Sequence, residues 1–291
     1  MSSGRRTDPF AAVPAALREG RVGGLRAAWW EAGPPDGRPV VLVHGGGVDE
    51  ARISWGLLIG PLAAAGMRVL APDLPGYGRS EGFGRRHAVP DLAGFLSAFL
   101  DGTGLSDAAL CGISMGGAAV LAAAHGRPDR VSSVIAVAPY GLMEQSPNPR
   151  LYWLAARLPV HRAAFAMIAG SGKVAYRSTA RLYGDPSRLD DALVAQVRHS
   201  ARRQARRPAF GDFARGEMTR QGFRTNLVPR LGEIERPVTL IHGTGDPLVP
   251  IDASRRAAAR SGVALRELPG GHILTRERPD EVRDAILAAI A

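Results

Sequence analysis

Cysteine is almost absent from this sequence, and its scarcity excludes internal cross-linking. Cys111 is the only cysteine in 291 residues, so no disulfide can form within the chain. Nothing therefore indicates an oxidising compartment. Cys111 lies in an apolar run, and we expect it to be a small buried strand residue and not a nucleophile.

The sequence also lacks the long apolar runs that membrane insertion requires. No apolar run follows the arginines near the N-terminus, so we expect no signal peptide. The most apolar long stretch, residues 53–71, is interrupted by three glycines, a proline and an arginine and is a poor membrane span. Hydrophobic residues still make up 45% of the chain, enough for a large core. We therefore expect a soluble, cytoplasmic globular protein without a membrane partner.

Lysine is equally scarce, which affects how the net charge of +10 is interpreted. Lys173 is the only lysine, so 36 of the 37 basic residues are arginine. Together with frequent alanine, this bias is typical of a GC-rich coding background. No zinc-ligand spacing, helix-turn-helix or mixture of aromatic and basic residues accompanies the charge, so we expect no nucleic-acid partner.

Short apolar runs alternate with helical patterns through the first half of the chain. We expect a strand pair around Gly23-Gly24, further strands at 39–43, 68–71, 109–113 and 131–137, and helices near 55–65 and 91–100. This alternation predicts an α/β fold with a mainly parallel sheet and helices on both faces. The carboxyl ends of the strands would then share one edge.

The alternation stops after Pro139. Residues 140–235 are rich in arginine, with helical patterns near 151–158, 165–168 and 189–204. Strand and helix patterns resume at 237–242, 252–260, 263–268 and 279–290. We therefore predict a core formed by residues 1–139 and 236–291, with residues 140–235 inserted into it.

Gly112-Ile113-Ser114-Met115-Gly116 has the G-x-S-x-G pattern of a nucleophile elbow. A sharp turn from strand to helix lifts the serine hydroxyl clear of the sheet, and side chains at the flanking positions would collide. A serine nucleophile also needs a base, and the base needs an acid. His272 follows the last predicted strand in a glycine-rich turn, and Asp246 follows the strand at 237–242. Both are expected at the sheet edge that carries Ser114.

These motifs, in this order, resemble the α/β-hydrolase superfamily. His44-Gly45-Gly46 is similar to its oxyanion loop, residues 73–80 to its D-x-x-G-x-G-x-S turn, and the order Ser114, Asp246, His272 to its catalytic triad. The resemblance implies a mostly parallel eight-stranded sheet with a helical cap inserted after the sixth strand. It also implies an oxyanion hole formed by the N–H groups of Met115 and Gly46, with Gly47 as the alternative, and it requires no metal or cofactor.

A cap at residues 140–235 would supply an apolar pocket, for which Tyr140, Trp153, Phe165 and Met167 are the candidates. We expect hydrolysis of a carboxylic ester or thioester of a hydrophobic small molecule through an acyl-enzyme. Alternatives are a thioesterase or cyclase acting on a chain bound to an acyl-carrier protein, a C–C bond hydrolase, and a non-hydrolytic receptor. By the same resemblance, a serine nucleophile argues against dehalogenases and epoxide hydrolases. Ile273 stands where many C–C bond hydrolases have tryptophan. The acyl group, the leaving group and the oligomeric state stay open.

Overall fold

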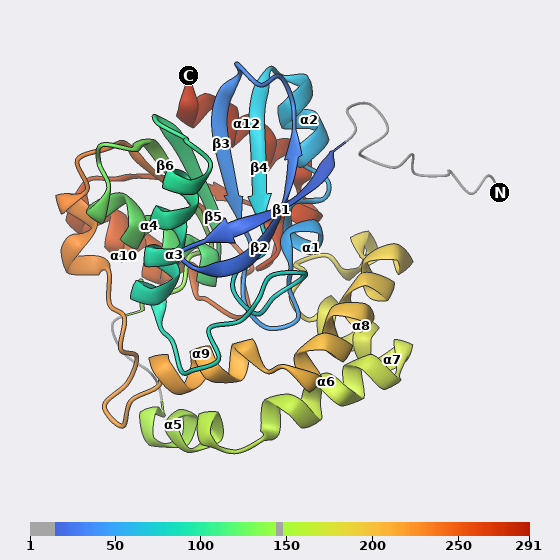
Figure 1. The fold of residues 1–291 in the computed structure, drawn as a ribbon. Coiled ribbons are helices and arrows are strands. Elements are labelled where there is room, and N and C mark those ends of the chain that lie inside the picture. The colour runs from blue at the N-terminus through green and yellow to red at the C-terminus, as the bar shows by residue number, and fades with distance from the viewer. Residues whose placement is uncertain (1–14, 144–147) are drawn as a thin grey trace.

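The computed structural model describes residues 15–143 and 148–291. Its centre is an eight-stranded sheet with the order β1-β2-β4-β3-β5-β6-β7-β8 (Figure 1). The strands are β1 (Ala16–Val22), β2 (Leu25–Ala32), β3 (Arg38–Val43), β4 (Met67–Pro72), β5 (Ala108–Ile113), β6 (Val131–Val137), β7 (Val238–Gly243) and β8 (Ala264–Leu268). The predicted fold class is confirmed.

Strand direction determines where the chain can place functional groups. Strands β1 and β2 form an antiparallel hairpin, and β2 also pairs antiparallel with β4, whereas all pairs from β4 to β8 are parallel. The hairpin turn is Gly23-Gly24, where both residues have positive φ, as the turn requires. The carboxyl ends of β3, β5, β7 and β8 consequently meet at one edge of the sheet.

Helices cover both faces of the sheet. One face packs against α3 (Val89–Gly102), α4 (Met115–Gly126) and α10 (Ile251–Ser261). The other packs against α1 (Ala51–Trp55), α2 (Ile59–Ala64) and α12 (Pro279–Ile290). Strands β3, β5 and β6 are almost entirely buried, as expected for parallel strands covered on both faces.

The helix predicted over residues 55–65 starts later than expected, as α2 at Ile59, and a separate short helix, α1, ends at Trp55. A continuous helix would need an N–H from Pro61 to bond the turn before it, and proline has none. The chain instead ends α1 at Trp55 and starts α2 at Ile59, which places Pro61 in the first turn, where no such bond is made.

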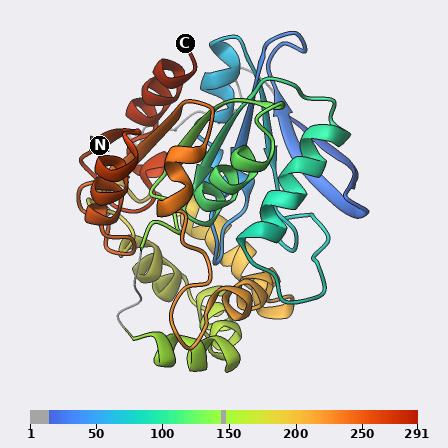
Figure 2. The same ribbon diagram turned by 90° about the vertical axis from the view of Figure 1, so that its left-hand side faces the viewer.

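Among the described residues between β6 and β7 there are five α-helices, and both views show them gathered beyond one end of the sheet (Figures 1 and 2). They are α5 (Pro149–Arg157), α6 (Val160–Gly170), α7 (Gly172–Ala180), α8 (Asp191–Arg206) and α9 (Ala209–Glu217). The sequence patterns indicated α5, α6 and α8 but not α7 or α9. Two short 3₁₀ segments, η1 (Pro186–Arg188) and η2 (Val228–Glu233), complete the insertion.

Parts of the insertion pack directly on the core. Ala209 and Phe213 of α9 and Val228 and Leu231 of η2 are buried in the core cluster that contains residues of α3, α4 and α10. Within the described ranges, no helix is both long and apolar enough to cross a membrane.

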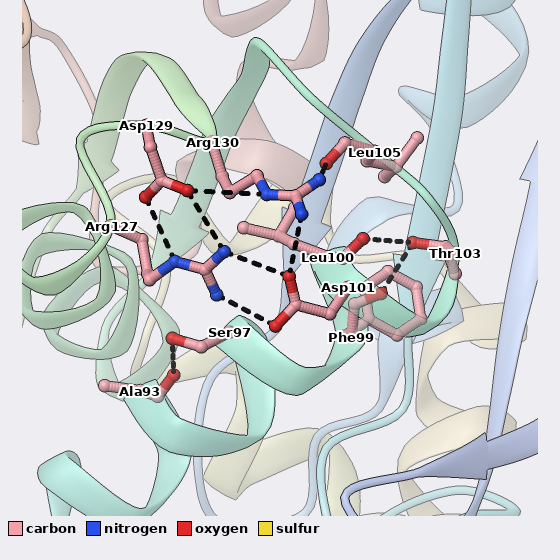
Figure 3. Close-up of polar contacts among 10 residues, drawn as sticks. All are labelled: Ala93, Ser97, Phe99, Leu100, Asp101, Thr103, Leu105, Arg127, Asp129 and Arg130. Atoms are coloured by element: carbon pink, nitrogen blue, oxygen red, sulfur yellow. Dashed lines mark hydrogen bonds and ion pairs between the residues drawn. The ribbon is translucent and has the colours of Figure 1, made fainter.

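Some of the arginines stabilise the edge of the sheet opposite the inserted helices. Arg127 forms a two-pronged ion pair with Asp101 at the end of α3 and also contacts Asp129, and Arg130 contacts both carboxylates (Figure 3). The hydrogen bonds that Arg127 donates to Asp101 and Asp129 raise the pKa of its guanidinium. This exposed network joins α3 to the loop before β6, and part of the arginine content is therefore structural.

Candidate active site

Ser114 occupies the turn between β5 and α4 in a strained conformation. Its φ of 53° and ψ of −117° lie outside the regions that non-glycine residues favour. The glycines on both sides are required because a Cβ on Gly112 would lie 2.3 Å from the Gly116 carbonyl oxygen, and one on Gly116 would lie 2.4 Å from the His44 carbonyl oxygen. The sharp turn leaves Ser114 partly exposed although β5 before it is buried.

His272 and Asp246 come together at the same edge of the sheet. Nδ1 of His272 lies 2.7 Å from Oδ2 of Asp246, and both side chains are buried. The other carboxylate oxygen, Oδ1, accepts the backbone N–H groups of Leu248 and Val249 at 2.8 and 2.9 Å. The carboxylate is thus fixed by the loop after β7 and presents one oxygen to His272.

His242, at the end of β7, is a third member of this buried group. Its Nε2 lies 3.2 Å from Oδ2 of Asp246 and 2.9 Å from the Val249 carbonyl oxygen. Two acceptors at Nε2 mean that this nitrogen carries the proton, so Nδ1 accepts the Ser254 hydroxyl at 2.7 Å. Burial acts to raise the pKa of Asp246, but hydrogen bonds from His242 and His272 lower it overall.

The loop after β3 presents a free backbone N–H to the same edge. The Gly45 N–H donates to Asp49 at 2.7 Å. The backbone of Gly47 hydrogen-bonds Tyr77. Burial raises the pKa of Tyr77, and this hydrogen bond partly offsets the rise. Across residues 15–143 and 148–291, the Gly46 N–H makes no hydrogen bond. This pattern favours Gly46 over Gly47 as a donor to a ligand.

His44 holds the Gly45–Gly46 peptide in place. Its Nε2 accepts the Leu74 N–H at 2.9 Å, so the proton lies on Nδ1, which donates to the Gly45 carbonyl oxygen at 2.7 Å. In a planar trans peptide, the carbonyl and the following N–H point in opposite directions. The hydrogen bond from His44 therefore fixes the direction of the Gly46 N–H. Met115 offers a second donor because, as the first residue of α4, its N–H has no partner within the helix.

Ser114, Met115, Gly46 and His272 all line one cavity of about 1010 Å³. The inserted helices form much of its wall, and that wall is mainly apolar. Side chains that contribute to it include Ile53, Tyr140, Phe165, Ile168, Phe210 and Phe223. Phe210 reaches Gly46 so closely that a Cβ there would lie 3.0 Å from its ring. The cavity is large enough for a drug-sized apolar molecule.

Two of the four predicted pocket residues are outside this cavity. Tyr140 and Phe165 line it, but Met167 is 60% exposed because the cavity side of α6 carries His161, Phe165 and Ile168. Trp153 lines a different cavity, because the side of α5 that faces the Ser114 cavity carries Tyr152, Ala155 and Ala156. The apolar character of Trp153 and Met167 gave no indication of which side of its helix each residue occupies.

The inserted segment also supports the His272 loop directly. The His272 N–H donates to the Leu182 carbonyl oxygen at 2.7 Å. Buried Glu277 accepts N–H groups from Gly184, Asp185 and Gly271 at 3.0, 2.8 and 2.8 Å. Glu277 thereby joins the loop after α7 to the turn that carries His272.

The fold and this site define an α/β-fold hydrolase. Residues 40–285 match the model of the alpha/beta hydrolase family, and the chain belongs to that family.

Similarity to known proteins extends over most of the chain. It is 29% identical over 274 residues to the dihydrolipoyllysine-residue acetyltransferase component of an acetoin cleaving system from Pseudomonas putida, covering 94% of this chain and 69% of the relative. It is 28% identical to a 2-hydroxy-6-oxo-6-phenylhexa-2,4-dienoate hydrolase from Burkholderia cepacia, covering 77% and 76%. In structure it is similar to a serine hydrolase involved in carbazole degradation, with a TM-score of 0.80, 21% identity and coverage of 95% and 98%.

Proposed function

We propose that this protein is a serine hydrolase that cleaves a carboxylic ester or thioester of a hydrophobic small molecule through an acyl-enzyme on Ser114. The observation that carries the proposal is the buried pair of His272 and Asp246, whose Nδ1 and Oδ2 atoms lie 2.7 Å apart, together with the fact that His272 lines the same cavity as the strained Ser114. A base oriented by a carboxylate and a partly exposed serine in one cavity are the groups needed to activate a hydroxyl.

In the acylation step, Oγ of Ser114 attacks the carbonyl carbon and its proton passes to Nε2 of His272. The negative charge that develops on the carbonyl oxygen is stabilised by the N–H groups of Met115 and Gly46, each worth about 3–4 kcal/mol in comparable sites. Asp246 stabilises the imidazolium through Nδ1. His272 then protonates the departing alcohol or thiol, leaving the acyl group on Ser114.

In the second step, water attacks the acyl carbonyl while His272 removes its proton. Collapse of the second oxyanion releases the acid and returns the proton to Ser114. The apolar wall of the cavity supports an acyl or alkyl group without charge, because burying an unpaired charge there would be costly.

A fluorophosphonate probe tests the nucleophile. We expect one covalent adduct on the intact protein, located on Ser114 by peptide mass spectrometry. Ser114→Ala abolishes both labelling and ester turnover, a loss on the order of 10⁶ in comparable triads. Ser97→Ala is the matched control, since Ser97 lies on α3 and its hydroxyl bonds the Ala93 carbonyl oxygen. Labelling of Ser114→Ala at another residue would overturn the assignment.

The relative from Burkholderia cepacia suggests a second candidate, hydrolysis of a 2-hydroxy-6-oxo-dienoate. Such a compound contains no ester, so its hydrolysis breaks a carbon–carbon bond. A panel of p-nitrophenyl esters, acyl thioesters and a 2-hydroxy-6-oxo-dienoate separates the two. We expect the largest kcat/KM on an ester or thioester; a larger value on the dienoate would favour the second candidate. Tight binding without turnover of any panel member would instead favour a receptor.

A further inference from the structure

A second cavity, of about 570 Å³, lies where the core meets the inserted helices. The core contributes the loop before α3, and the insertion contributes α5, the end of α9 and the segment after α9. Five arginines line it, and we call it the arginine cavity. They are Arg86, Arg157, Arg215, Arg220 and Arg224.

The charge of the arginine cavity is mostly uncompensated. Arg215 pairs with Asp212, and Asp91, a carboxylate in the lining, pairs with Arg85 outside it. Over the described ranges 15–143 and 148–291, Arg86, Arg157 and Arg220 form no ion pair. Arg224 forms no ion pair in these ranges either, and its Nε donates to the Gly216 carbonyl oxygen at 2.7 Å. Four of the five guanidinium groups in the lining therefore lack a paired carboxylate.

Two of these guanidinium groups lie against the ring of Trp153. The Cζ atoms of Arg157 and Arg220 lie 4.1 and 4.5 Å from the centre of its ring. Partial burial and the charges of Arg86, Arg220 and Arg215 lower the pKa of Arg157. Like charges held together in this way repel one another, so an anion in the cavity would relieve the repulsion.

We propose that the arginine cavity binds a small phosphate-bearing molecule that carries at least two negative charges. Guanidinium groups donate paired hydrogen bonds that match phosphate oxygens, and four without an ion pair suit a multiply charged group better than a single carboxylate. Such a ligand would bridge Arg86 of the core to Arg157 and Arg220 of the insertion. This site is separate from Ser114 and goes beyond the proposed hydrolysis.

Titration of the Ser114→Ala protein with inorganic pyrophosphate tests the site without turnover. Trp153 is the reporter, and Trp153→Phe shows how much of the fluorescence change comes from it. We expect saturable binding by calorimetry and fluorescence. In Arg157→Ala/Arg220→Ala, Kd rises about tenfold or more, because two charge-assisted hydrogen-bonding groups are lost.

Arg202→Ala/Arg206→Ala is the charge-matched control, since both residues are exposed on α8 and outside the cavity lining. It keeps the Kd of the parent protein. Arg157→Lys/Arg220→Lys keeps the charge but loses the paired donors, and binds with intermediate affinity. Absence of saturable binding, or equal weakening by both alanine pairs, overturns the proposal.

A further measurement, which rests on the proposed function, identifies the source of the phosphate. Hydrolysis of an acyl-coenzyme A is compared with that of the same acyl group on N-acetylcysteamine, which has no phosphate. If the Arg157→Ala/Arg220→Ala variant has a higher KM for acyl-coenzyme A but not for the N-acetylcysteamine thioester, this supports binding of a phosphate-bearing leaving group in the arginine cavity. Equal KM effects alongside pyrophosphate binding support a separate phosphate ligand. If neither thioester is hydrolysed, the proposed hydrolase function fails but the calorimetric measurement of pyrophosphate binding still stands. The two proposals can therefore fail independently.

Discussion

Nε2 of His242 lies 3.2 Å from Oδ2 of Asp246, the same oxygen that lies 2.7 Å from Nδ1 of His272. Two imidazoles therefore share one carboxylate oxygen in a buried setting. The Val249 carbonyl and the Asp246 carboxylate, which can only accept, place the proton of His242 on Nε2, and Nδ1 then accepts the Ser254 hydroxyl. In the proposed reaction His242 would be a positioning residue, because it contacts Asp246.

Replacing His242 should change the pH dependence of catalysis as well as its rate. His242→Phe removes one donor from Asp246, so more of the carboxylate charge acts on the His272 imidazolium. We expect kcat to fall about tenfold, the equivalent of about 1.4 kcal/mol, and the acid limb of the pH–rate profile to move to higher pH. His242→Gln keeps an N–H donor and should restore much of both. A uniform loss without movement of the limb would indicate a merely structural role.

Gly112 should tolerate no side chain. Gly112→Ala places a Cβ 2.3 Å from the Gly116 carbonyl oxygen, so the elbow must shift. We expect a loss of about 3 kcal/mol in the free energy of unfolding, together with loss of fluorophosphonate labelling. The matched control is Gly94→Ala in α3, where a Cβ meets nothing within 4 Å; it should stabilise the protein by about 0.5–1 kcal/mol. Urea unfolding followed by circular dichroism measures both.

Glu217 should be required as a carboxylate where the insertion joins the core. It is fully buried and accepts four hydrogen bonds, from the Val89 N–H, the Tyr140 hydroxyl, and the N–H and hydroxyl of Thr225. Glu217→Gln would place an amide N–H group, a donor, opposite groups that are themselves donors. It should lower the free energy of unfolding by about 2–3 kcal/mol. Tyr140→Phe, which removes one donor, should cost less. Equal stability of Glu217→Gln and the parent in urea would contradict this account.

Glu50 should make stability depend on pH. Burial, followed by the charges of Asp73 and Asp49, raises its pKa from 4.5 to about 7 despite Arg203 nearby. Between these values the folded state binds a proton that the unfolded state has lost, so stability falls as pH rises from 4.5 through 7. Glu50→Gln should therefore raise Tm at pH 8 and leave it nearly unchanged at pH 4. A Tm gain of equal size at both pH values would argue against ionisation of Glu50 as the cause.

The sequence alone determined the sheet and the positions of Ser114, Asp246 and His272 along it. These follow from short-range rules: apolar runs form buried strands, glycines permit the sharp turn, and parallel strands place their carboxyl ends together. The hydrogen bonds of His44 and His242 could not be predicted in this way, because their partners, Leu74 for the first and Ser254 and Asp246 for the second, lie on other elements or in loops.

Only the tertiary structure decided which side chains line the cavity at Ser114. Trp153 and Met167 are as apolar as Phe165, yet packing turns Trp153 toward Arg220 and leaves Met167 exposed. The arginine cavity likewise joins Arg86 to residues far along the chain. Helical periodicity describes the sides of one helix, but which side meets the cavity depends on neighbours distant in sequence. The motifs around Ser114 thus depend on residues close together in the sequence, whereas the shape of the cavities depends on how the insertion packs on the core.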